Sequence, residues 1–121
     1  MIQGLRTVVY HTPDLEAGKN WYSLVVGKPP YFDQPFYVGF EVSGFELGLV
    51  PDGKPGAGGT IAYWGAANAE AECQRLLALG AEIVDELKDV GEGIRVATLK
   101  DPFGNLFGVI ENPHFDLAKV R

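Results

Sequence analysis

The segment Asp14-Leu15-Glu16-Ala17 recurs 54 positions later as Asn68-Ala69-Glu70-Ala71. Each copy begins with a residue whose side-chain oxygen can cap a helix, and each places a glutamate in the first turn, where it complements the helix dipole. The same shift aligns the apolar run Val8-Val9-Tyr10 with Ala62-Tyr63-Trp64. The sequence therefore predicts two copies of one plan, each with a strand, a capped helix and several short strands. Two such halves would form a pseudo-symmetric shell around a central cleft, and a cleft of this kind favours a small ligand.

The first copy opens with the apolar and β-branched run from Leu5 to Tyr10, which predicts a buried strand. Thr12-Pro13-Asp14 ends this strand, and the helix that Asp14 caps is expected to end near Gly27. Apolar residues at helical spacing predict the buried face of this helix. They are Ala17, Trp21, Leu24 and Val25.

The next segments predict a hairpin, with strands over 36–42 and 45–50 around the turn Ser43-Gly44. Residues 51–59 then form a linker that is rich in proline and glycine. Gly53-Lys54 within this linker lacks the serine or threonine and the helix that a phosphate loop requires. The linker is therefore expected to connect the two copies and not to bind a nucleotide.

The second copy repeats the plan around a helix that begins after Asn68 and ends at Gly80, where a left-handed cap is expected. Its strands are predicted over 60–65, 81–90, 94–100 and 106–111. Its helix has the apolar positions Ala69, Cys73, Leu76 and Leu77. Because Cys73 lies among them, it is expected to be an inert core residue.

Composition restricts the partners of this chain. A length of 121 residues predicts a single domain, over 1–121, that is large enough to bury a core. The net charge of −6 argues against nucleic acid, which is bound through clustered lysine and arginine, and favours a neutral or cationic ligand. The N-terminus has no signal-peptide pattern, no apolar run is long enough to span a bilayer, and the single Cys73 fits a reducing compartment. We therefore expect a cytoplasmic protein with no membrane partner.

The order of these motifs resembles that of the vicinal oxygen chelate superfamily, which includes glyoxalase I, the bleomycin-resistance proteins and the extradiol dioxygenases. The stretch Thr12-Pro13-Asp14-Leu15-Glu16, with Trp21-Tyr22 and Gly27, is similar to the first module of that family. The stretch Asp101-Pro102-Phe103-Gly104-Asn105 resembles the turn before its last strand.

The resemblance implies an α+β fold. Two tandem βαβββ modules would form a curved mixed sheet around a cleft within one domain, with the helices outside. The modules would cover about 4–50 and 60–112, joined by the linker 51–59 and followed by a tail over 113–121. A homodimer is expected, because a second subunit usually completes or borders the cavity in this family, and because open strand edges favour pairing.

In metal-using members of the family, the ligands come from the first, fourth, fifth and eighth strands. By position they fall here on Thr7, Glu46, Ile61 and Gly108. A divalent site needs three or more nitrogen, oxygen or sulfur ligands around one point, and Ile61 and Gly108 supply no side-chain donor. A shift of one residue offers no better set: Arg6, Val8, Thr60, Ala62, Phe107 and Val109. We therefore expect no metal and no other cofactor.

Strand alternation predicts the lining of the cleft, because alternate residues share one face of a sheet. This face is mostly apolar with a few polar groups, as in many small-molecule pockets. The candidate ligand-binding residues are Thr7, Val9, His11, Glu46, Tyr63 and Gly108. On the opposite face, Tyr10 and Trp64 are expected to point toward the helices.

His11 and Glu46 are also the candidate catalytic residues. His11 could serve as a general base, or it could bond a nearby backbone group at the end of its strand. Glu46 could work with it as acid or base, or it could pair with a lysine or arginine at the rim of the cavity. His114 and Phe115 are expected to belong to a tail that packs on the domain or on its partner.

Two classes of function stay open at this point. The first is a metal-free binding protein of the bleomycin-resistance type, which would sequester a small organic molecule without chemistry. The second is an enzyme: a metal-free catalyst that uses His11 and Glu46, a lyase of the glyoxalase I type, or a dioxygenase of the extradiol type. The missing metal ligands and the acidic charge favour the first class.

Overall fold

The computed structural model describes residues 1–54, 59–102 and 106–120. Each half of the chain has a strand, a helix and then further strands, as the repeat predicts. In chain order the elements are β1 (Ile2–His11), α1 (Leu15–Val26), β2 (Phe32–Gln34), β3 (Tyr37–Val42), β4 (Phe45–Val50), β5 (Ile61–Ala66), α2 (Ala69–Ala78), β6 (Glu82–Asp89), β7 (Arg95–Lys100), β8 (Leu106–Glu111) and a 3-10 helix, Leu117–Lys119. None of the helices in the described residues is long and apolar enough to cross a membrane.

The chain divides into two compact units that share strand β1. The α1 unit comprises Thr7–Ile61 together with the segment that begins at Asp116. The α2 unit comprises Met1–Arg6 and Ala62–Phe115. The first half of β1 therefore belongs to the unit that contains the second helix, and the second half belongs to the unit that contains the first helix.

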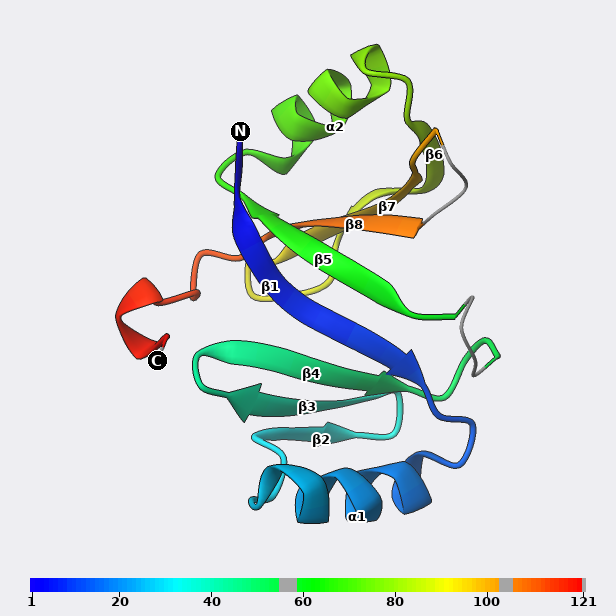
Figure 1. The fold of residues 1–121 in the computed structure, drawn as a ribbon, viewed down its shortest axis with the longest axis vertical. Coiled ribbons are helices and arrows are strands. Elements are labelled where there is room, and N and C mark those ends of the chain that lie inside the picture. The colour runs from blue at the N-terminus through cyan, green and yellow to red at the C-terminus, as the bar shows by residue number, and fades with distance from the viewer. Residues whose placement is uncertain (55–58, 103–105, 121) are drawn as a thin grey trace. The chain divides into compact units, whose positions relative to one another are not determined.

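The α1 unit is a four-stranded sheet with one helix on one face. Its strands lie in the order β2-β3-β4-β1, in which β1 and β4 are parallel and β3 and β4 are antiparallel (Figure 1). The fully buried side chains of Val38, Phe40 and Leu49 form its core. These residues lie on the same face of β3 and β4, because side chains alternate along a strand. The residues between them therefore point to the opposite face of the sheet.

The prediction of which face of α1 is buried is wrong. Leu15, Tyr22 and Val26 are the residues of α1 that pack against the core. The exposed residues of α1 include all four that were expected inside: Ala17, Trp21, Leu24 and Val25. The helix has apolar residues on both sides, so periodicity alone could not decide which side faces the sheet.

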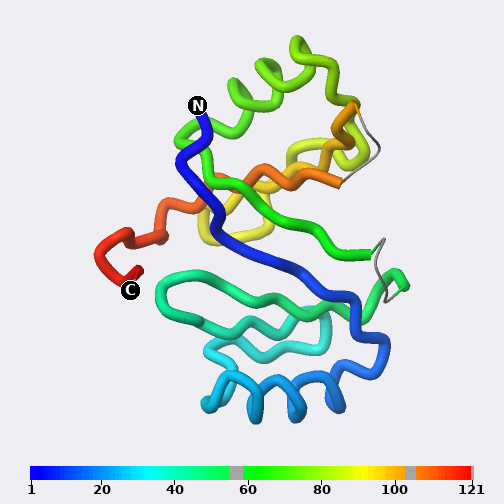
Figure 2. The backbone as a smooth tube through the Cα atoms, viewed as in Figure 1, coloured from blue at the N-terminus to red at the C-terminus, as the bar shows by residue number. Residues whose placement is uncertain are grey.

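Local signals set the ends of α1 and the following turn as predicted. Asp14 Oδ1 accepts a hydrogen bond from the backbone N–H of Ala17, and Gly27 ends the helix in the left-handed conformation with φ 79°. The β3–β4 turn has positive φ at both Ser43 and Gly44. A Cβ on Gly44 would lie 2.7 Å from the backbone nitrogen of Val120, because the C-terminal segment lies beside this turn (Figure 2).

The α2 unit has its strands in the order β1-β5-β8-β7-β6. β5 and β8 are parallel, and β7 is antiparallel to both β8 and β6. Its core contains all four apolar residues predicted for the helix, Ala69, Cys73, Leu76 and Leu77. Cys73 is a buried free thiol, and burial raises its pKa, as expected for an inert core cysteine.

The aromatic residues expected on the helix side do lie there in each unit. Tyr10 packs against Tyr22 of α1, with ring centroids 5.9 Å apart. Trp64 stacks on Phe107, with centroids 5.5 Å apart, and Phe107 packs against the core beneath α2. The opposite faces of both sheets are therefore formed by the residues that alternate with these.

A carboxylate and two cations tie the N-terminus of the chain to α2. The side chain of Glu72 is only 2% exposed, and it accepts hydrogen bonds from Arg75 Nε at 2.9 Å and from Arg75 Nη2 at 2.6 Å. The N-terminal ammonium of Met1 lies 3.3 Å from the same carboxylate. These charges hold the pKa of Glu72 below its usual value, chiefly through the hydrogen bonds from Arg75.

The elements that the sequence did not predict are short. Strand β2 has only three residues, and the 3-10 helix lies in the tail. The tail does pack on the chain, since His114 Nε2 donates a hydrogen bond to the carbonyl of Glu92 at 2.8 Å. Parts of the predicted linker and of the turn after Asp101 lie outside the described residues.

Candidate functional site

The candidate site of the α1 unit lies on the face of the sheet opposite α1. Strand β1 is in parallel register with β4, so that Thr7 lies beside Glu46 and Val9 lies beside Gly48. Gly48 in turn lies beside Gly39 of β3. Since Leu47 and Leu49 belong to the core under α1, Glu46 and Gly48 point to the other face.

Two tyrosine hydroxyls converge on the carboxylate of Glu46. Tyr31 donates a hydrogen bond to Glu46 Oε1, and Tyr37 donates one to Glu46 Oε2. The glycines of this face make room for both rings. A Cβ on Gly39 would lie 3.2 Å from a ring carbon of each tyrosine, and a Cβ on Gly48 would lie 2.7 Å from Tyr37 Cζ.

Further aromatic rings continue this arrangement. The ring of Phe32 lies 6.5 Å from that of Tyr31, and 6.1 Å from those of both Phe36 and Tyr37. The side chains of Tyr31 and Phe36 are 64% and 66% exposed, so the group borders solvent. Tyr31 and Tyr37 were not singled out from the sequence; the signal that could have found Tyr37 is strand alternation, because Val38 beside it is a core residue.

The charge of Glu46 is balanced by hydroxyl groups and not by a cation. Among the residues that the structure describes, ion pairs within 4.0 Å join lysine, arginine or the N-terminus to other carboxylates, and none of them involves Glu46. The interpretation of Glu46 as part of a salt bridge therefore does not describe this geometry. Two neutral donors stabilise the carboxylate but leave its net charge in place.

His11 lies in the same unit but apart from Glu46. Its Nδ1 donates a hydrogen bond to the carbonyl oxygen of Asp52 at 2.5 Å, and its ring contacts Gly53 and Gly59 closely enough to exclude a side chain there. His11 pairs with Val50, four residues beyond Glu46 along the parallel strands. At about 3.3 Å per residue, His11 and Glu46 are therefore about 13 Å apart along the sheet.

The corresponding positions of the α2 unit hold Tyr63 and Gly108. Tyr63 pairs with Gly108, and Gly108 pairs with Thr98. A Cβ on Gly108 would lie 2.7 Å from Tyr63 Cε1, so the tyrosine ring covers the glycine. Burial raises the pKa of Tyr63, and a side-chain hydrogen bond with Thr98 acts in the opposite direction by lowering this pKa.

The residues at the metal-ligand positions of the family do not fit a divalent metal. Thr7 is 7% exposed and offers one hydroxyl, while Ile61 and Gly108 offer no donor, which leaves Glu46 as the one strong ligand of the four. Within residues 1–54, 59–102 and 106–120, no three His, Cys, Asp or Glu side chains come together in a way that could hold a metal ion. The donor set therefore does not support a metal step at these positions.

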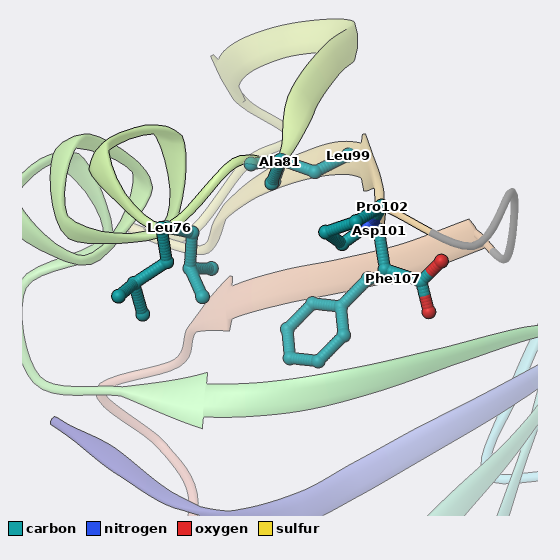
Figure 3. A pocket seen from close by; sticks show the side chains of 7 residues that line it. Leu76, Ala81, Leu99, Asp101, Pro102 and Phe107 are labelled. Carbon is teal, nitrogen blue, oxygen red and sulfur yellow. The ribbon is translucent and has the colours of Figure 1, made fainter.

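A small cavity in the α2 unit lies on the helix side of its sheet and involves none of the predicted site residues. Figure 3 shows its lining, and the cavity volume is about 110 Å³. The lining residues are Leu76, Leu79, Ala81, Leu99, Asp101, Pro102 and Phe107. Small-molecule sites occupy roughly 300–1,000 Å³, so this cavity is a gap in the packing under α2 and not a candidate ligand site.

Residues 4–109 match the model of the Glyoxalase/Bleomycin resistance protein/Dioxygenase superfamily. The chain belongs to this superfamily. The family resemblance drawn from the sequence is thereby confirmed, as is the α+β fold class. A comparison with curated protein sequences finds no match.

Several solved structures share this fold at low sequence identity. A methylmalonyl-CoA epimerase of Streptomyces coelicolor is 14% identical, covers 96% of this chain and 99% of its own, and gives a TM-score of 0.72. A superfamily member from Vibrio splendidus 12B01 is 19% identical over 88% of this chain and 97% of its own, with a TM-score of 0.66. A Mn(II)-bound glyoxalase from Novosphingobium aromaticivorans is 20% identical over 91% of this chain and 39% of its own, with a TM-score of 0.71. At these identities the comparison establishes the fold alone.

Proposed function

We propose that this chain is a small-molecule-binding member of its superfamily that works without a metal of the family type, and that its ligand is held at Glu46. The observation that carries this proposal is the carboxylate of Glu46, which accepts hydrogen bonds from Tyr31 and Tyr37 on the face of the sheet opposite α1. Because two side-chain donors already hold this carboxylate in place, the Glu46 side chain loses little conformational entropy when a ligand binds.

The ligand that suits this site is neutral or cationic and partly aromatic. Glu46 forms no ion pair among the described residues. Tyr31 and Tyr37 bind its carboxylate, and the ring of Phe32 lies beside the rings of both tyrosines. A cationic group could pair with the carboxylate while its apolar part contacts the rings. The net charge of −6 favours the approach of such a ligand.

Thr7 and Val9 would border the ligand, because they lie beside Glu46 and Gly48 in the register of β1 and β4. Tyr63, Gly108 and His11 stay predictions for ligand contact. A catalytic pair of His11 and Glu46 is the less supported alternative, since the two residues are about 13 Å apart along the strands and His11 is engaged with Asp52.

A screen of organic cations and neutral aromatic compounds by thermal shift, followed by calorimetry on Glu46→Gln and Tyr37→Phe, tests the proposal. Both substitutions should weaken the binding of a hit, Glu46→Gln by about 1–3 kcal/mol because the charge is lost. Glu16→Gln is the matched control, because it removes an equal charge from the exposed surface of the same unit. Hits whose affinity is unchanged by Glu46→Gln and Tyr37→Phe would place the ligand elsewhere.

Elemental analysis and activity assays separate this proposal from the metalloenzyme alternatives. We expect purified protein to contain no stoichiometric Zn, Ni, Fe or Mn, and no turnover of methylglyoxal–glutathione adducts or catechols. About one metal equivalent per chain that is lost in Glu46→Gln would instead support a metal-dependent lyase or dioxygenase.

We further propose a homodimer. The exposed apolar residues of α1, Trp21, Leu24 and Val25, are 59%, 82% and 57% exposed, and a monomer would leave this surface in water. Light scattering coupled to size exclusion should give about twice the chain mass of 13.1 kDa at micromolar concentration. A clean monomer under these conditions would contradict this part of the proposal.

A further inference from the structure

Arg6 of the α2 unit is held in an unusual environment for an arginine in an acidic protein. Its guanidinium carbon lies 3.7 Å from the centroid of the Phe115 ring. Its side chain also lies against the backbone of Gly65, where a Cβ would come within 2.7 Å of Arg6 Nε and 2.9 Å of Arg6 Cζ. The guanidinium is therefore held in place by contacts with two neighbours, the backbone of Gly65 and the ring of Phe115.

The charge of Arg6 has no acidic partner in the part of the chain that the structure describes. Nη1 donates one hydrogen bond, to the carbonyl of Leu5 at 3.1 Å. Arg75 and Arg95, in contrast, each form an ion pair with a glutamate of the same unit. Burial lowers the pKa of Arg6, and no carboxylate acts in the opposite direction.

A guanidinium that is fixed in place and lacks a carboxylate is suited to an oxyanion. Its N–H donors form a rigid planar fork that matches two oxygen atoms of a carboxylate or phosphate. The contacts with Gly65 and Phe115 hold the group before any ligand arrives, which reduces the entropy lost on binding. A surface arginine in solvent would offer neither advantage.

We propose that Arg6, positioned by Gly65 and Phe115, is a binding site for an oxyanion, either the carboxylate or the phosphate group of a small molecule. The proposal goes beyond the one made for Glu46, since it rests on other residues and concerns a ligand group of the opposite charge. The competing explanation is structural: Arg6 would only anchor Phe115, and with it the end of the α2 unit.

Nuclear magnetic resonance of the arginine Nε–Hε groups in the whole protein tests the proposal directly. Sodium phosphate and sodium acetate are titrated separately against sodium chloride at constant ionic strength. We expect the Arg6 signal to shift and saturate at millimolar concentrations of at least one oxyanion, while the Arg75 signal, whose group is already paired with Glu72, stays in place. Phosphate and acetate titrations identify which of the two oxyanions the fork prefers.

Variants distinguish binding from a structural role. In these variants binding is followed by the backbone amide signals of residues 65 and 115, which lie beside the guanidinium. Arg6→Lys keeps the charge but removes the fork, so binding should weaken about tenfold or more, and Gly65→Ala should weaken it by displacing the guanidinium. Arg95→Gln is the control, because it removes one positive charge from the same unit and should leave the Arg6 titration unchanged.

A shift of Arg6 that does not saturate, or that equals the shift of Arg75, would overturn the proposal. So would a titration that Arg6→Lys and Arg95→Gln weaken equally, because bulk electrostatics would then explain it. If Arg6→Lys lowers the thermal stability and the wild-type protein shows no saturable response to either oxyanion, Arg6 only anchors Phe115.

Discussion

Each unit holds a glutamate on which several side-chain donors converge, Glu72 in one and Glu46 in the other, and the donors of the two differ in charge. In the α2 unit, Glu72 is buried and paired with Arg75 and the N-terminal ammonium of Met1. In the α1 unit, Glu46 accepts hydrogen bonds from the hydroxyls of Tyr31 and Tyr37. Cations of the chain itself therefore neutralise Glu72, whereas the charge of Glu46 stays available to a cationic ligand. The first arrangement is suited to stability and the second to ligand binding.

The largest effect is expected from the loss of Glu72. Replacing Glu72 with alanine should lower the free energy of unfolding by about 2–3 kcal/mol, because the charge-assisted hydrogen bonds that this buried carboxylate accepts from Arg75 are lost. Urea denaturation at neutral pH measures this change. Glu70→Ala is the matched control, since Glu70 lies in the same first turn of α2 but is exposed. Equal losses in the two variants would mean that the ion pairs around Glu72 contribute nothing.

Acid should act through the same carboxylate. The pKa of Glu72 in the folded chain lies below its ordinary value of 4.5, so its contribution to stability is fully present above pH 4.5 and is lost as the pH falls through the lowered pKa. Denaturation curves between pH 6 and pH 3 should therefore show a steeper loss of stability in the wild type than in Glu72→Ala. Parallel curves for the two proteins would assign acid unfolding to other groups.

The two glycines at corresponding positions, Gly108 and Gly48, should respond differently to alanine. At Gly108 the new methyl group would meet the body of the Tyr63 ring, which should cost about 2 kcal/mol. At Gly48 it would meet the hydroxyl end of Tyr37, which can move, so the cost should be about 1 kcal/mol while the bond to Glu46 is lost. Denaturation measures the first difference, and ligand affinity measures the second. If ligand binding were weaker in Gly108→Ala than in Gly48→Ala, the expected roles of the two glycines in binding would be reversed.

The smallest change in stability is expected at Glu46. Replacing Glu46 with glutamine should change the free energy of unfolding by less than about 0.5 kcal/mol, because the amide can still accept a hydrogen bond and no cation loses its partner. Thermal and urea unfolding of this variant beside Glu72→Ala give a direct contrast. A loss at Glu46 as large as that at Glu72 would show that its carboxylate is structural.

Local signals in the sequence were enough to predict most of the secondary structure. Asp14, Gly27 and Asn68 act through hydrogen bonds and backbone angles that depend on neighbouring residues alone, so their effects could be predicted. The buried side of α1 could not, because both sides of that helix are apolar and only packing against β3 and β4 selects one. For the same reason the exposure of Trp21 was missed.

The candidate site was predictable only in part. Glu46 was found because its position in the fourth strand matches a ligand position of the family. Tyr31 and Tyr37 were missed because their approach to Glu46 depends on the room that Gly39 and Gly48 leave, which is a property of the paired strands and not of either segment alone. Arg6 is a similar case, since Gly65 and Phe115 come to it from distant parts of the sequence.

The division of strand β1 between the two units has a consequence for synthesis on the ribosome. The α1 unit takes all but its last segment from Thr7–Ile61, so most of it is available to fold before the second helix is made. Residues 1–6 belong to the α2 unit, and their neighbouring strand β5 is made only after the main segment of the α1 unit. Residues 1–6 are therefore made before the strands of their own unit, and the segment that begins at Asp116 is made last among the parts of the α1 unit.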